Sequence, residues 1–147
     1  MSQLAKNKRA FFDYEHLSTF EAGISLSGQE VKSMKTGHIS LKGAFVTVHK
    51  GELYLTNAFV PPYKFAGKLP NYDPYQSRKL LVSKAQLNNL IGRAKTDGLT
   101  IVPLSVYTKG RYIKVGCAVA RGKKEHDKRA TIKKRDSDRS INRVLKG

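Results

Sequence analysis

Two carboxylates stand in an otherwise basic part of the sequence and could recognise another molecule by accepting hydrogen bonds. Glu21 lies in the segment FEAG, and Glu30 lies in GQEVKS. A carboxylate weakens the attraction of a basic surface for phosphate, but it accepts hydrogen bonds from base amino groups or ribose hydroxyls and so adds selectivity. The alternative is that both glutamates balance neighbouring lysines such as Lys32. Both interpretations stay open at the level of sequence.

Basic residues gather in three clusters, at positions 7–9, 78–79 and 123–135. Arg78 and Lys79 follow a proline-containing loop and precede two leucines, a pattern that predicts charge at the rim of the fold with aliphatic side chains in or near the core. Aromatic side chains of the loop before them could stack on unpaired bases or could fill the loop. These aromatic residues are Tyr63, Phe65, Tyr72 and Tyr75.

Catalytic chemistry finds no support in the sequence. The histidines are scattered and have no spacing that would place two of them on one metal. The single cysteine, Cys117, lies in the apolar run VGCAVA and is interpreted as a core residue, with no partner for a disulfide. Glycine-rich phosphate loops and nucleophile elbows are absent, so we expect neither an enzyme nor a cofactor or metal site. The histidines are His16, His38, His49 and His126.

Charge divides the chain into a body and a tail. The formal net charge is +17 over 147 residues. Residues 123–147 hold ten lysines and arginines, four acidic residues and five aliphatic side chains, so they carry about +6, and residues 1–122 about +11. The tail buries too little apolar surface to offset the entropy of ordering, which predicts disorder in the free protein. A basic body with a basic tail is typical of a nucleic-acid binder, although a merely solubilising tail is the alternative.

Membrane association is the least supported of the anionic partners. No apolar run approaches the roughly 20 residues that span a bilayer, and the tail lacks the apolar face of an interfacial helix. The N-terminal segment has no apolar stretch of the kind a signal peptide needs, which predicts a cytoplasmic protein.

Hydrophobic patterning predicts a mainly β fold with one clear helix. Residues 83–96 have capping-box spacing at Ser83 and Gln86 and one apolar face, and Gly98 follows as a stop signal. Five or six strands with one real helix favour a small closed β-barrel with peripheral helices, because closure removes exposed edges. The predicted elements are a strand at 20–26, a helical turn at 30–35, a hairpin of 45–49 and 53–59, the helix at 83–96, and a hairpin of 99–107 and 112–120.

Six motifs occur in order along nearly the whole chain. They are NKRAFFDYE (7–15), FEAG (20–23), GQEVKS (28–33), NYDP with RKLLV (71–82), GLTIVPLSVY (98–107) and GKKEHDKR (122–129). Together they resemble the SsrA-binding protein family, also called small protein B or SmpB. The resemblance implies an OB-like barrel at 1–122 that binds the elbow of the tRNA-like domain of transfer-messenger RNA. It further implies delivery of that RNA to stalled ribosomes for trans-translation.

The resemblance also assigns site residues. Within matching motifs, it implies RNA-binding roles for Asn7, Glu21 and Leu81. Neighbouring positions are added by proximity, namely Lys8, Arg9, Glu30, Lys32, Arg78 and Lys79. In the tail, it assigns Asp127, Lys128 and Arg129 to the decoding region and Arg143, Val144, Leu145 and Lys146 to accommodation of the alanyl-charged RNA. The other tail positions expected to contact ribosomal RNA are Lys123, Lys124, His126, Lys133, Lys134 and Arg135.

The implied partners are transfer-messenger RNA and the ribosome, at its decoding centre and mRNA channel. Alanyl-tRNA synthetase and elongation factor Tu would be engaged indirectly through the RNA. The chain departs from the family pattern at Gln76, where many relatives carry arginine, so one phosphate contact of that loop is in doubt. Arginines at 135, 139 and 143 would form one helical stripe, which predicts a tail that becomes helical only against ribosomal RNA. The alternative function is a general OB-type single-strand binder or a ribosomal protein.

Overall fold

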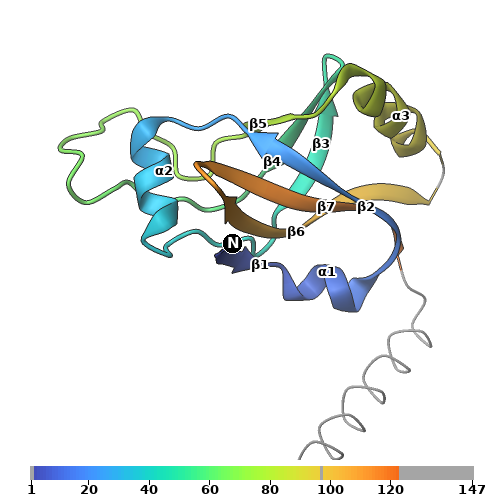
Figure 1. The fold of residues 1–147 in the computed structure, drawn as a ribbon, viewed down its shortest axis with the longest axis horizontal. Helices are drawn as coiled ribbons and strands as arrows, with labels where there is room; N and C mark the ends of the chain where they lie inside the picture. The colour runs from blue at the N-terminus through green and yellow to red at the C-terminus, as the bar shows by residue number, and fades with distance from the viewer. Residues whose placement is uncertain (1, 97, 123–147) are drawn as a thin grey trace, which may run out of the picture.

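The computed structural model describes residues 2–96 and 98–122, which form seven strands and three helices (Figure 1). The elements are β1 (Gln3–Lys6), α1 (Lys8–Asp13), β2 (Tyr14–Ile24), α2 (Gly28–Lys35), β3 (Phe45–His49), β4 (Glu52–Thr56), β5 (Arg78–Leu81), α3 (Lys84–Ala94), β6 (Leu99–Lys109) and β7 (Tyr112–Gly122).

The strands form one antiparallel sheet in the order β1-β6-β7-β2-β5-β4-β3. The expectation of a mainly β fold is therefore confirmed. The sheet is not closed, because β1 and β3 are its two edges and do not pair with each other, so the closed barrel is not confirmed. β1 occupies the edge of β6 at residues 105–107. Beside the first half of β6, a cavity of about 400 Å³ lies between Val46 and Val48 of β3 and Leu99 and Ile101 of β6.

Both predicted hairpins are present. The β3–β4 turn at Lys50 and Gly51 has φ angles of 50° and 73°, the left-handed conformation that a two-residue type I′ turn requires at both positions. The fourth strand ends at Thr56, earlier than expected, because Asn57 turns the chain with a φ of 65°. Both strands of the β6–β7 hairpin begin where predicted, and each extends two residues beyond its predicted C-terminal end.

The helices lie around the sheet, with α2 and α3 at opposite ends of the molecule and α1 along its lower edge (Figure 1). Ser83 is the N-cap of α3, and its side chain accepts a hydrogen bond from the Gln86 backbone at 3.2 Å, which confirms the predicted start of that helix. The strand β2 begins at Tyr14, six residues before the predicted strand. The elements β1, α1 and β5 were not predicted.

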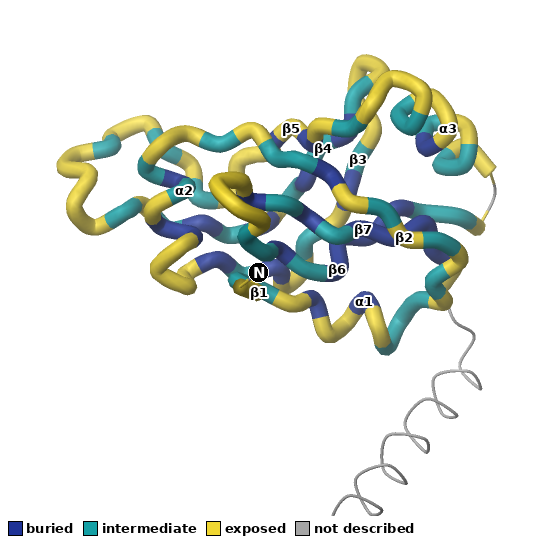
Figure 2. Tube along the Cα trace, viewed as in Figure 1, coloured by how far each residue is buried: buried dark blue, intermediate teal, exposed yellow. Residues whose placement is uncertain are grey.

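The core lies inside the curled sheet, where buried stretches of the central strands meet (Figure 2). Met34 of α2 and Leu90 of α3 close this core from the two ends. The opposite face of β2, β7 and β6 is covered in part by α1, where Ala10 packs against a second buried cluster, and the rest of this face points outward. Fully buried aliphatic residues of the core include Leu53, Leu55, Leu80, Val106, Val115 and Val119.

Candidate nucleic-acid interface

Glu21 lies on the outward face of β2 and has two partners from β6, the strand beyond the intervening β7. The Tyr107 hydroxyl donates a hydrogen bond to Oε2 of Glu21, and the Lys109 ammonium lies 3.3 Å from Oε1. The hydrogen bond from Tyr107, followed by the charges of Lys109 and Lys114, lowers the pKa of Glu21 below its usual value. Glu21 is therefore an ionised, oriented acceptor on the surface.

Tyr107 reaches Glu21 across β7 because the intervening strand carries a glycine there. Glu21 pairs with Gly116 in the β2–β7 register. A Cβ atom at Gly116 would lie 3.4 Å from Cε1 of Tyr107 and 3.3 Å from Oγ of Ser105, so the ring occupies the space that a larger residue would fill. Burial, together with the adjacent Glu21 carboxylate, raises the pKa of Tyr107 to about 12. Its hydroxyl therefore stays a hydrogen-bond donor at neutral pH.

Leu81 lies on the same outward face, one strand away. It pairs with Gly23 in the β2–β5 register, two residues along β2 from Glu21, and it is 50% exposed. It borders a cavity of about 310 Å³ that is also lined by Val31 of α2 and by Tyr112 of β7. An apolar, half-exposed side chain beside an ionised acceptor gives this face both a packing contact and a polar contact.

Basic and aromatic side chains complete this surface. Lys79 projects from β5 and lies 3.6 Å from Glu52 of β4, and both side chains are partly exposed. The Lys114 ammonium lies 5.6 Å from the centre of the Tyr112 ring. We call this surface the outer sheet face and define it by Glu21, Lys79, Leu81, Tyr107, Lys109, Tyr112 and Lys114.

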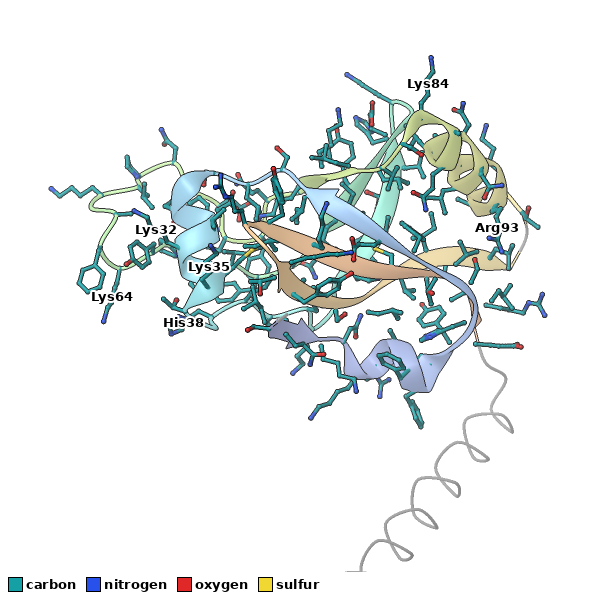
Figure 3. The ribbon with its side chains drawn as sticks, viewed as in Figure 1. Lys32, Lys35, His38, Lys64, Lys84 and Arg93 are labelled. Carbon is teal, nitrogen blue, oxygen red and sulfur yellow. The ribbon has the colours of Figure 1, made fainter. Side chains whose placement is uncertain are left out.

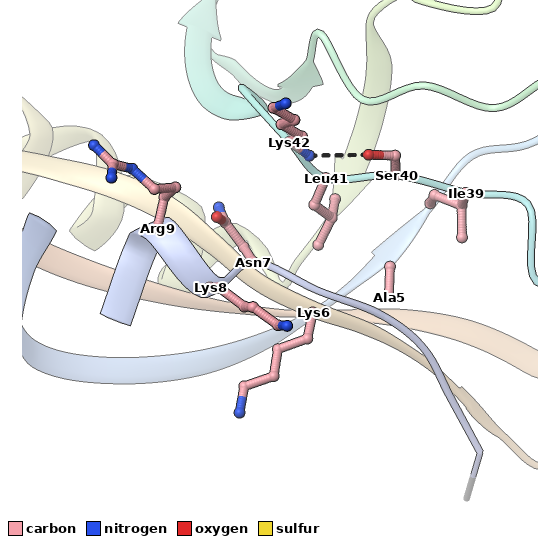
Figure 4. Close-up of a pocket in the computed structure, with 9 residues that line it drawn as sticks. All are labelled: Ala5, Lys6, Asn7, Lys8, Arg9, Ile39, Ser40, Leu41 and Lys42. Carbon is pink, nitrogen blue, oxygen red and sulfur yellow. Dashed lines mark hydrogen bonds between the residues drawn. The ribbon is translucent and has the colours of Figure 1, made fainter. Parts of the chain in front are cut away.

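Asn7 lies away from the outer sheet face, at the start of α1. Its Nδ2 donates to the Pro103 carbonyl at 2.9 Å, and its Oδ1 accepts from the Ala10 backbone at 3.3 Å. The side chain is thus a buried N-cap that ties α1 to β6. It positions Lys8 and Arg9, which are exposed beside a cavity of about 370 Å³ (Figure 4).

Glu30 and Arg78 are both buried, and they contact each other. Nε of Arg78 donates to Oε2 of Glu30 at 2.6 Å. Arg78 is 3% exposed, so the expectation that it lies at the rim of the fold is wrong: the carboxylate of Glu30 and three oxygen atoms of the surrounding loop satisfy its guanidinium inside the protein.

Glu30 is also the N3 residue of the capping box that it forms with Ser27 at the start of α2. Burial alone would raise the pKa of Glu30, but hydrogen bonds from the Ser27 backbone and from the Arg78 guanidinium lower it below its usual value. Lys32, which the sequence offered as a balancing charge, instead lies 5.9 Å from the centre of the Tyr63 ring on the exposed side of α2.

The structure therefore separates the expected site residues into groups. Glu21, Lys79 and Leu81 share the outer sheet face, Lys8 and Arg9 flank α1, and Lys32 lies on α2. Asn7, Glu30 and Arg78 are buried and act on the surface only through the elements they position. All of the tail positions lie outside the described residues.

Sequence reasoning missed Tyr107, Lys109, Lys114 and Gly116. The signal that could have found them is the register between β2 and β7, which the sequence does not provide. The S-x-x-E spacing of Ser27 and Glu30 is a capping-box signature and could have indicated the role of Glu30.

Metal and thiol chemistry find no site in the part of the chain that the structure describes. Residues 2–96 and 98–122 contain no group of three or more His, Cys, Asp or Glu side chains that could hold a metal ion. Within the same residues, no helix is long and apolar enough to cross a membrane. Cys117 is buried in the core, as expected, and burial raises the pKa of its thiol to about 12.

A strongly basic, mainly β protein with a polar and aromatic sheet face falls in the class of nucleic-acid-binding β proteins. The sequence model of the family described as "SmpB protein" matches residues 4–147. The SsrA-binding protein of Chloroflexus aurantiacus is 47% identical over 143 residues, which cover 97% of this chain and 89% of that protein. The SsrA-binding protein of Enterococcus faecalis is 46% identical, with 97% and 92% covered.

Among solved structures, a chain described under "tmRNA-SmpB: a journey to the center of the bacterial ribosome" is similar with a TM-score of 0.66. The identity is 47%, and the match covers 82% of this chain and 84% of that one. The chain belongs to the SmpB family of SsrA-binding proteins. The family expected from the six sequence motifs is thereby confirmed.

Proposed function

We propose that this protein is an adaptor that binds the tRNA-like domain of transfer-messenger RNA and delivers it to stalled ribosomes for trans-translation. It performs no chemistry of its own. Two findings support the proposal: the relatives are named SsrA-binding proteins, and the similar solved structure describes SmpB with transfer-messenger RNA in the bacterial ribosome. The proposed activity is cytoplasmic, because it takes place on the ribosome.

The observation that carries the proposal is the ionised Glu21 held between Tyr107 and Lys109 on a basic sheet face. Lysine ammonium groups attract phosphates regardless of sequence, whereas an oriented carboxylate accepts hydrogen bonds only from suitably placed base or ribose donors. Leu81 beside it packs against a base or ribose. This combination suits one folded RNA better than an arbitrary single strand.

The remaining residues act through position or charge in this proposal. Lys79, Lys8 and Arg9 contact phosphates, and Asn7 holds α1 in place. Glu30 and Arg78 support the loop between β4 and β5, and Lys32 contributes a charge on α2. Residues 123–147 contact the decoding centre and the mRNA channel. Alanyl-tRNA synthetase and elongation factor Tu are engaged through the RNA.

We also propose that the curled sheet serves as an OB-like platform, although its hydrogen-bond ladder is open. The cavity between β3 and β6 supports this, because the two strands approach each other there around shared apolar side chains.

A Glu21→Gln variant tests the proposal, because it keeps the size of the side chain but removes its charge. We expect weaker binding to the tRNA-like domain at fixed salt and an unchanged melting temperature, since an exposed strand position contributes little to stability. Glu15→Gln is the matched control, because Glu15 is an exposed carboxylate on the same strand. Wild-type affinity of the Glu21 variant would refute the assignment of this face.

A general single-strand binder is the second candidate, favoured by Tyr112, which is 68% exposed on the outer sheet face. Competition separates the two functions. Bulk tRNA or unstructured RNA would displace transfer-messenger RNA from a sequence-tolerant binder, whereas the adaptor would retain transfer-messenger RNA in the presence of these competitors.

A further inference from the structure

A separate cavity lies at the α2 end of the molecule, away from the outer sheet face. It has a volume of about 300 Å³ and lies between the second half of α2, His38 and residues 61–65. It shares no lining residue with the cavity beside Leu81. Its volume is at the lower end of the range for small-molecule sites.

The walls of this cavity are fixed by hydrogen bonds. Ser33 Oγ donates to the Pro61 carbonyl at 2.6 Å, and the Tyr63 backbone donates to the Gln29 side chain at 2.9 Å. Thr36 Oγ1 lies 2.8 Å from Nδ1 of His38, which fixes the orientation of the imidazole. The loop is thus held against α2 at two points.

Aromatic rings and cations meet at this cavity. Phe65 is 73% exposed, and its ring centre lies 5.5 Å from that of Tyr63 in an edge-on arrangement. The Lys64 ammonium lies 4.8 Å from the centre of the Phe65 ring, and that of Lys32 lies 5.9 Å from Tyr63. In Figure 3, Lys32, Lys35, His38 and Lys64 gather at this end, far from Lys84 and Arg93.

An exposed phenylalanine beside one lysine ammonium group, with a second lysine on the adjacent tyrosine, suits a ligand with a flat apolar face and a nearby negative charge. A nucleotide has both, because its base stacks on aromatic rings and its phosphate attracts lysine. Among the described residues, Nε2 of His38 has no hydrogen-bond partner within the protein, so it can contact the edge of a base that enters.

We propose that this cavity binds one unpaired nucleotide of the RNA, with its base on Phe65 and its phosphates near Lys32 and Lys64. The inference rests on the proposed function, since it concerns a second contact with the RNA. The buried pair of Glu30 and Arg78 supports the site, because Arg78 donates to the Ala58 and Pro74 carbonyls on the two sides of the loop.

The test uses the full chain and a short single-stranded oligoribonucleotide that carries one 2-aminopurine, whose fluorescence is quenched by stacking. We expect quenching with the wild type. Phe65→Ala should lower the affinity by about 5- to 150-fold, the range for loss of one base–aromatic stack. Phe65→Leu should lose quenching as well, because leucine keeps apolar volume but has no ring. Phe45→Ala is the matched control, since Phe45 is a partly exposed ring on β3.

Lys64→Ala adds a charge test. It should reduce the slope of log affinity against log salt by about 0.7, the value for one phosphate contact with single-stranded RNA. Unchanged quenching in both Phe65 variants would overturn the inference, and so would quenching that disappears only in Tyr112→Ala, because the base would then stack on the outer sheet face.

Titration with transfer-messenger RNA separates this inference from the proposed function. If the wild type binds that RNA and the Phe65 variants bind it equally well with unchanged quenching of the oligonucleotide, only the nucleotide cavity is wrong. If the wild type shows no preference for that RNA over bulk tRNA, the proposed function is wrong.

Discussion

Nε of Arg78 lies 2.6 Å from Oε2 of Glu30, and both side chains are almost completely buried. The contact joins β5 to α2 across 48 positions of the sequence. The Tyr72 hydroxyl donates to the Val60 carbonyl at 2.7 Å and lies 3.2 Å from Oε2 of Glu30. One buried ion pair thereby holds α2, β5 and the long loop between β4 and β5 in a fixed relation.

Removing one partner of this pair should destabilise the protein strongly. Glu30→Gln keeps the shape of the side chain but leaves the Arg78 guanidinium buried without a counter-charge, which costs about 3–5 kcal/mol. Urea titration followed by circular dichroism measures the change in the free energy of unfolding. Lys79→Ala is the control, because this neighbouring cation is exposed and its loss should change stability by at most about 0.5 kcal/mol. Equal effects of the two substitutions would contradict the structural role of the pair.

Acid should weaken the fold through the same carboxylate. The pKa of Glu30 in the folded protein lies below its ordinary value of 4.5, so its stabilisation is fully present above pH 4.5. It is lost as the pH falls from 4.5 through the lowered pKa, because the folded state then has to take up a proton that the unfolded state binds more readily. Urea midpoints measured between pH 6 and pH 3 should decline, and the decline should be shallower in Glu30→Gln. Parallel declines in the two proteins would exclude Glu30 as the source.

The predicted and observed roles of Arg78 differ for a physical reason. The sequence shows a charged pair before two leucines, and alternation along a strand places only one of those charges outside. The pairing of β5 with β2 and β4 decides which of the two charges lies outside. In this pairing, Leu81 lies opposite Gly23 and Lys79 lies opposite Tyr54. Local sequence contains no information on that register, so both cations were expected at the surface.

The long elements were predictable, and the short ones were not. The helix α3 and the two hairpins carry clear periodicity and turn signals. In contrast, β1 has four residues and α1 has six, too few for either period to be recognised. Tertiary contacts stabilise both of these short elements, such as the hydrogen bond from the Asn7 backbone to the Leu104 carbonyl at 2.8 Å.

The candidate site was predictable only in part for the same reason. Glu21 and Leu81 were found through motifs, and they do share a face. The residues that orient Glu21 come from a hairpin 86 and more positions away, and only the sheet brings them together.

The hydroxyl of Tyr107 should contribute more to RNA binding than to the stability of the fold. Tyr107→Phe removes the hydroxyl that orients Glu21, so the RNA must order that side chain itself. Ordering one such side chain costs about 0.5–1.5 kcal/mol, or about a 2- to 10-fold loss of affinity for the tRNA-like domain. Filter binding at fixed salt measures the loss. The control is Tyr75→Phe, because Tyr75 is an exposed tyrosine of the loop between β4 and β5 and lies outside the outer sheet face. Comparable losses in both variants would argue against preorganisation by Tyr107.

The basic tail, residues 123–147, should separate RNA binding from action on the ribosome. Deleting residues 127–147 leaves the outer sheet face and its charges in place, so affinity for transfer-messenger RNA should stay near the wild-type value. Transfer of alanine to a nascent chain on a stalled ribosome should be abolished, because the cations expected at the decoding centre are gone.

Charge reversal tests the same tail without shortening it. Replacing Lys128 and Arg129 by glutamate sets carboxylates against ribosomal phosphates, and it should abolish alanine transfer while leaving the RNA affinity of the body intact. Replacing both by glutamine is the matched control, since it removes attraction without adding repulsion and should cause the smaller loss. The measurement is tagging of a peptide in a reconstituted translation system with an mRNA that lacks a stop codon. Tagging at the normal rate by the truncated protein would mean that the tail is only a solubilising extension, and delivery to the ribosome would then depend on residues 1–126 alone.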